Sequence, residues 1–99
     1  MEASLTHEEF AQHVNTNFQV QIDENTGVQL ELVQISELKL YPHQEEFSLL
    51  FRGPSDMFLG QGVRNVSHEA MGQFELFIVP IRQDGQGFYY EAIFNRLRQ

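Results

Sequence analysis

The 99-residue sequence contains no cysteine. Disulfide frameworks, thiolate metal sites and cysteine nucleophiles are therefore excluded. No apolar run approaches the roughly 20 residues that a helix needs to span a bilayer. The first ten residues are acidic and lack the apolar stretch of a secretory signal, so we expect a cytoplasmic protein.

Basic residues are scarce as well. Six of them stand against fourteen acids, which gives a net charge of −8. Residues 1–50 hold nine acids and one base, Lys39, and so carry all of this charge, whereas residues 51–99 hold five of each. Such a chain repels phosphate backbones and anionic lipid, so we expect neither nucleic acid nor membrane as a partner. The acidic half is either a solvated surface or a docking face for a basic partner.

The length fits one domain, which we predict over residues 1–99. Its first segment has helical periodicity. Thr6 and Glu9 have the spacing of a capping box, and Leu5 and Phe10 that of a hydrophobic staple. We predict a helix over about residues 7–14, which must pack on the rest of the chain because so short a helix is marginal in water.

From Phe18 onward the apolar residues recur with a period of two. Alternating stretches bounded by turn residues predict about six strands, near residues 18–22, 28–40, 47–51, 63–67, 74–81 and 88–95. A slip of phase at Leu32-Val33 indicates a bulge or bend. The run 74–81 is apolar on both faces in its second half, which predicts a central place in the sheet.

These elements predict a mainly β (α+β) fold with one short N-terminal helix. The short turns cannot form the crossover that parallel strands need, so about six antiparallel strands should form a small barrel or a two-layer roll. Alternation on the most apolar strands also predicts the most buried residues, which are Phe47, Leu49, Phe51, Leu76, Ile78 and Phe94.

No arrangement of residues predicts a metal or cofactor site. His7 and His13 are six residues apart on the predicted helix, so they face largely opposite sides and lack the i, i+4 spacing of helical zinc ligands. The Gly-x-Gly fragments at 60–62 and 85–87 precede no helix, and we interpret both as turns, not as phosphate loops.

We also identify no catalytic residues. His43 and His68 are single loop residues, and no Ser-His-Asp arrangement can be argued from their spacing. A hydrolase that pairs one of them with Asp56 or Glu69 is the least favoured hypothesis, and we do not expect an enzyme.

Candidate contact residues lie in one loop and on the last strand. Met57, Phe58 and Leu59 are adjacent, and three large apolar loop residues form either a lid on the barrel end or a contact patch. Tyr89 and Tyr90 follow one another, so one faces inward and the other outward. An outward Tyr89 is a candidate interface anchor, or it lies with its hydroxyl at the sheet rim.

The stretch Glu46–Pro54 contains F-S-L-L-F-R-G-P, a signature in a family of small uncharacterised bacterial domains (domain of unknown function) that the chain resembles. The resemblance extends to residues 5–10, 61–62, 75–80 and 90–95 and to His68, and it departs at Arg64, where the family often has an aromatic residue. It implies no activity and no catalytic residues. Its association with phage-tail-like gene neighbourhoods implies a structural or assembly role.

The end of this signature has a physical interpretation as a strand exit. We predict that Arg52 caps carbonyls or pairs with a buried acid such as Glu75 or Glu91. Gly53 should permit a backbone turn, and Pro54 should block further ladder pairing. These are structural roles.

The sequence therefore predicts a non-enzymatic structural or protein-interaction module without cofactors. Its partner is a protein or a second copy of the chain, either through self-association or within a phage-tail-like assembly. The alternative is a barrel that binds a small apolar ligand, although six strands leave little interior room.

Overall fold

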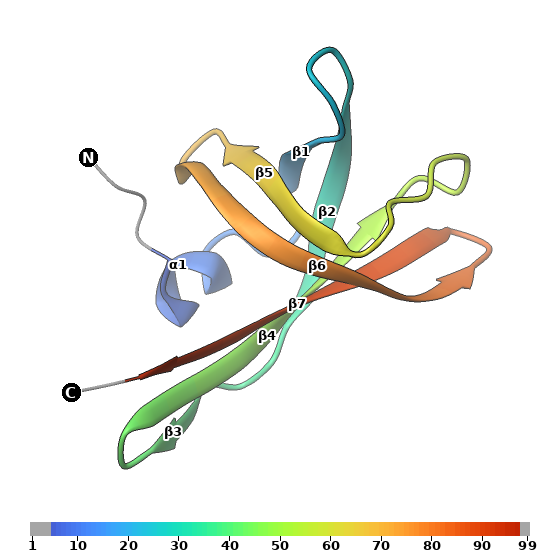
Figure 1. The fold of residues 1–99 in the computed structure, drawn as a ribbon. Coiled ribbons are helices and arrows are strands. Elements are labelled where there is room, and N and C mark those ends of the chain that lie inside the picture. Colours follow the sequence, from blue (N-terminus) through green and yellow to red (C-terminus); the bar gives the residue numbers. More distant parts are fainter. Residues whose placement is uncertain (1–4, 98–99) are drawn as a thin grey trace.

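The structure is a computed structural model that describes residues 5–97. One helix and seven strands occur in this part of the chain (Figure 1). They are α1 (His7–Ala11), β1 (Asn17–Gln21), β2 (Gly27–Ile35), β3 (Lys39–Tyr41), β4 (Gln44–Gly53), β5 (Gly62–His68), β6 (Gly72–Asp84) and β7 (Gly87–Leu97).

The strands form one antiparallel sheet in the order β2-β1-β5-β6-β7-β4-β3. A further pairing between β2 and β4 closes the first six of these strands into a barrel. β3 stays outside the barrel as a short hairpin partner of β4. The predicted mainly β fold is confirmed, and of the two expected architectures the chain adopts the barrel. β4 and β7 continue side by side beyond the end of the β6–β7 pairing, with β3 along the edge of β4 there (Figure 1).

The helix is shorter than predicted. Thr6 caps it as expected, since its Oγ1 accepts a hydrogen bond of 3.1 Å from the Glu9 N–H. However, α1 ends at Ala11 and a turn follows, in which Asn15 has a φ of 72°. The reason is a competing partner: the Asn15 N–H donates to the Leu32 carbonyl at 2.6 Å, which ties the turn to β2.

α1 packs over the barrel core, as so short a helix must. Phe10 is fully buried, and its ring centroid lies 5.4 to 6.3 Å from the centroids of four other phenylalanine rings, those of Phe18, Phe47, Phe74 and Phe94. The predicted core is confirmed at Phe47, Leu49, Phe51, Leu76 and Ile78. Phe94 stacks on Phe47 but is only half-buried, because it lies beyond Glu91, where the pairing of β7 with β6 ends and only β4 flanks it.

Two irregularities re-aim side chains along the barrel wall. The predicted phase slip is present, because the β2–β4 register shifts between Leu32 and Gln34. A second shift occurs in β6 between Pro80 and Arg82. β6 lies between β5 and β7, which agrees with its predicted central place. Its outer face nevertheless carries an exposed residue, Phe77, because a barrel wall is a single layer that covers only the inner face.

Candidate functional site

The loop of Met57, Phe58 and Leu59 was predicted to be either a lid or a contact patch, and its residues take both roles. Leu59 is buried, and its N–H donates a hydrogen bond of 2.9 Å to the hydroxyl of Tyr90 inside the barrel. Met57 and Phe58 are exposed, and the Phe58 ring lies edge-on to Phe88 with centroids 5.2 Å apart. Leu59 therefore acts as the lid, and only its two neighbours present a surface.

Arg64 supports this loop from β5. Its Nη2 donates a hydrogen bond of 2.8 Å to the Gly60 carbonyl. An arginine side chain from β5 thus ties the loop to the barrel.

Tyr89 does not present a free outer surface. It points outward from β7 but is only 7% exposed, because the Arg82 guanidinium stacks 4.4 Å above its ring centroid. On its other side lies Arg52, and the hydrogen bond between them is the main reason that the pKa of Arg52 is raised. A partner would have to displace arginine before it reached this ring.

The ionic partner predicted for Arg52 was wrong. Its guanidinium pairs with Glu31 at 2.6 Å and donates to the Gln86 side chain at 2.9 Å, and it pairs with neither Glu75 nor Glu91. The correct partner lies directly opposite on β2, in a pairing that exists only because the barrel closes.

Gly53 has a different role from the predicted turn. It continues the ladder with β7, and an added Cβ would lie 2.5 Å from Leu30 Cδ2 and 3.4 Å from the ring of Tyr90. The position requires glycine because the core fills the space where a side chain would be. The prediction that Pro54 ends the strand pairing agrees with the structure, in which β4 ends at Gly53.

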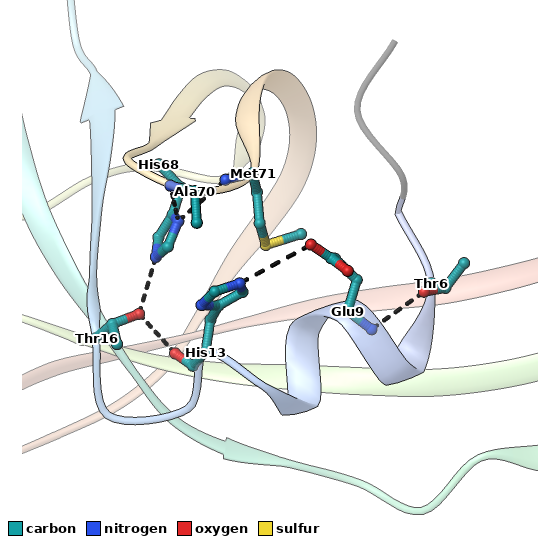
Figure 2. Close-up of polar contacts among 7 residues, drawn as sticks. All are labelled: Thr6, Glu9, His13, Thr16, His68, Ala70 and Met71. Atoms are coloured by element: carbon teal, nitrogen blue, oxygen red, sulfur yellow. Dashed lines mark hydrogen bonds and ion pairs between the residues drawn. The ribbon is translucent and has the colours of Figure 1, made fainter. Parts of the chain in front are cut away.

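The side-chain cluster with the most potential for chemistry joins the turn after α1 to the β5–β6 turn (Figure 2). His68 Nδ1 accepts hydrogen bonds from the backbone N–H groups of Ala70 and Met71, at 3.0 and 3.3 Å. This leaves the ring proton on Nε2, which lies 2.9 Å from Thr16 Oγ1. The Thr16 hydroxyl in turn donates to the His13 carbonyl at 2.6 Å.

These hydrogen bonds already occupy the Thr16 hydroxyl and both His68 ring nitrogens, the atoms that nucleophilic catalysis would need. The Thr16 proton points to a carbonyl and His68 Nδ1 is occupied, so His68 cannot take a proton from Thr16 as a base would. No carboxylate orients His68 among the described residues, and burial together with the neighbouring His13 lowers its pKa. The cluster therefore locks two turns together. Within residues 5–97, no group of three or more potential ligands is placed to hold a metal ion.

The other residues of the hydrolase hypothesis are not assembled into such a cluster. His43 is exposed in the β3–β4 turn, and Asp56 is exposed in the loop after β4. Neither side chain has a hydrogen bond or ion pair with a described residue. Glu69, next to His68 in the chain, acts on its ring only through its charge.

The hollows in the described surface are open. One of about 640 Å³ lies over β1, β5 and β6 and is lined largely by amide and hydroxyl side chains, among them Gln19, Asn65 and Ser67. Another, of about 840 Å³, includes the histidine cluster. The barrel interior is filled instead by aromatic and aliphatic side chains, of which Tyr90, Phe18 and Phe51 are among the largest fully buried ones.

The sequence-based search missed an apolar surface on the outside of the barrel. Val63, Phe77 and Ile93 are 62%, 50% and 62% exposed, and we call them the outer apolar patch. Val63 and Phe77 are directly opposite on β5 and β6. Phe77 and Ile93 each lie two residues from the last β6–β7 pair, Val79↔Glu91, at the point where these strands diverge.

One signal could have revealed the patch. Val63 alternates with Asn65 and Ser67, so these three share one face of β5, and it is the polar face. The same holds for Ile93, which shares its face of β7 with Glu91 and Asn95. An apolar residue on an otherwise polar strand face indicates an exposed apolar side chain.

A small hollow of about 190 Å³ lies beside Ile93. Two carboxylates, from Glu46 and Glu91, and one ammonium group, from Lys39, are on its walls. At Ile93 the patch thus adjoins a concave surface on which carboxylates outnumber cations by two to one.

The fold and these surfaces define a small closed antiparallel β-barrel, capped by a helix and lacking a catalytic arrangement in its described part. The chain belongs to a family described as a domain of unknown function (DUF6916), whose model matches residues 5–94. No curated protein and no solved structure matches it. Among residues 5–97, no helix is long and apolar enough to cross a membrane.

Proposed function

We propose that this barrel is a non-enzymatic protein-interaction module that binds its partner through the outer apolar patch. The observation that carries the proposal is the exposure of Val63, Phe77 and Ile93, each at least half exposed, on adjacent strands of one wall. Exposed large apolar residues that gather on one face of a soluble domain are typical of contact sites.

The architecture supports this use of the wall. Two of the three patch residues are held in a direct β5–β6 pair, and the third lies on β7, which is paired with β4 along ten residues. A rigid patch loses little conformational entropy when it is covered, which favours binding. The loop residues Met57 and Phe58 extend from the barrel end and form a second, smaller apolar surface.

The resemblance to small bacterial domains with phage-tail-like gene neighbourhoods supports a place in a larger assembly. The alternative, a carrier of a small apolar ligand, has less support, because side chains occupy the barrel interior and the hollows described above are open. No observation on the described residues favours an enzyme.

A photocrosslinking amino acid at position 77, tested in the organism that makes the protein, examines the proposal. We expect one discrete covalent adduct, which disappears when Val63 and Ile93 are both changed to serine. The matched control carries the crosslinker at Leu40, which is also exposed but lies on the outer strand β3. An adduct of equal yield from both positions, or none from position 77, would overturn the proposal.

A further inference from the structure

The charges around the outer apolar patch define the kind of partner it fits. Glu75 is directly opposite Asn65 on the β5–β6 pair, two residues before Phe77. Glu91 is two residues before Ile93, and Glu46 shares the small hollow with it. None of these three carboxylates forms an ion pair with a described residue.

The barrel has few cations with which to neutralise this rim. Arg52 is bound to Glu31, and Arg96 to Glu45. Arg82 stacks on Tyr89, and Arg64 donates to a loop carbonyl. Among residues 5–97, only Lys39 brings a positive charge to the rim, where it lies opposite Glu46 on the β3–β4 pair.

A partner that covers the patch must therefore supply cations. Carboxylates that lose water at the edge of an interface are costly unless a cation replaces that hydration. A second copy of this chain is a poor partner for the patch, because a symmetric (isologous) dimer contact would place the same patch of both copies face to face. Three carboxylates and one ammonium group from each copy would then meet, between chains of net charge −8.

We infer that the outer apolar patch binds a polypeptide segment in which apolar side chains are flanked by lysine or arginine. This inference rests on the proposed function and adds the chemistry of the partner. One apolar side chain contacts Ile93 beside the small hollow, and others cover Val63 and Phe77. The flanking cations pair with Glu91 and Glu75, and opposite charge also steers the approach of the two chains.

The probe is a ten-residue peptide of alternating leucine and lysine, titrated into the full chain labelled with ¹⁵N. We expect the amide signals of Val63, Phe77 and Ile93 to shift, with affinity that falls at least several-fold from low to high salt. Two comparison peptides separate the contributions. Replacing leucine with serine removes the apolar contact, and replacing lysine with glutamate reverses the charge, so both should bind at least tenfold more weakly.

Matched variants locate the effect. The double change Glu75→Gln and Glu91→Gln should weaken binding of the leucine-lysine peptide roughly three- to tenfold, the range for two partly exposed ion pairs. Glu8→Gln with Glu69→Gln removes the same charge from exposed carboxylates that line neither the small hollow nor the hollow beside Glu75, and it should change affinity less than twofold. If the two double variants weaken peptide binding equally, general electrostatic attraction between peptide and protein explains the binding, and the inference fails.

The two proposals can fail separately. If the crosslink from position 77 persists unchanged in the Glu75→Gln and Glu91→Gln variant, the interaction function stands and the basic partner is wrong. If sedimentation shows a dimer that Phe77→Ser abolishes, the occupant is a second copy and the inference is also overturned. If position 77 gives no adduct, the proposed function itself fails.

Discussion

The backbone N–H of Leu59 and the hydroxyl of Tyr90 meet inside the barrel, 2.9 Å apart, although 31 residues separate them in the sequence. Leu59 belongs to the loop after β4, and Tyr90 is a fully buried residue of β7. This bond holds the loop down as a lid and satisfies a polar hydroxyl in an apolar core. It also explains why Tyr90 is fully buried and yet is a tyrosine.

Tyr90→Phe should remove the acceptor and leave the Leu59 N–H buried without a partner. We expect a loss of about 1–3 kcal/mol in the free energy of unfolding, measured by urea denaturation. Hydrogen exchange should become faster at the Leu59 amide and remain slow in β5 and β6. Phe58→Ala removes an exposed ring from the same loop and should leave the Leu59 amide protected. Equal acceleration in both variants would show that ring packing, not this bond, holds the lid.

Alternation in the sequence was enough to predict the antiparallel strands, the phase slip at Leu32 and most of the core. It could not predict which strands close the barrel. The β2–β4 and β1–β5 pairs join segments that are not consecutive, and the ionic partner of Arg52 depends on the first of them. Local patterns contain no information on such distant pairings.

The candidate surface was missed for a related reason. A period of two assigns Phe77 to one face of its strand, but it does not say whether another layer covers that face. The contact residues chosen from the sequence were assessed by their chemistry alone. Of these, Leu59 and Tyr89 are buried by Tyr90 and Arg82, which come from distant segments.

A pair of glycines should respond in opposite ways to alanine. At Gly53 the new Cβ meets Leu30, which is fully buried and cannot move aside, so we expect a loss of about 1–3 kcal/mol. At Gly60 nothing lies within 4 Å of the new Cβ, and φ is outside the left-handed region. Gly60→Ala should be neutral or stabilise by up to about 1 kcal/mol. Thermal melts of the two variants check this, and similar melting temperatures would contradict it.

Phe10→Ala should be among the most damaging single changes. The ring is fully buried against four other phenylalanines, so its removal leaves a cavity and should cost about 3–5 kcal/mol. Thr6→Ala removes only the exposed cap of the same helix and should cost about 1 kcal/mol. If urea denaturation gives Phe10→Ala a loss no larger than Thr6→Ala, α1 is an independent arm and does not close the barrel.

Acid should destabilise the folded chain through His68. Burial, with help from His13 and against the charge of Glu69, lowers the pKa of His68 below its ordinary value of 6.5. The folded chain thus holds fewer protons at this site than the unfolded chain. The stability that neutral His68 contributes is fully present above pH 6.5 and is lost as the pH falls through 6.5 and then through the lower folded pKa. Protonation would place a hydrogen on Nδ1, where two backbone N–H groups already point.

His68→Asn tests this because the asparagine oxygen can occupy the place of Nδ1 without titrating near neutral pH. We expect the wild type to be more stable than the variant at pH 7.5, and the difference in unfolding free energy to narrow toward pH 5. His43→Asn removes an exposed histidine from the β3–β4 turn and should differ little from the wild type at pH 7.5. A stability difference between wild type and His68→Asn that stays constant or widens with acid would mean that the lock between the two turns does not depend on the neutral ring.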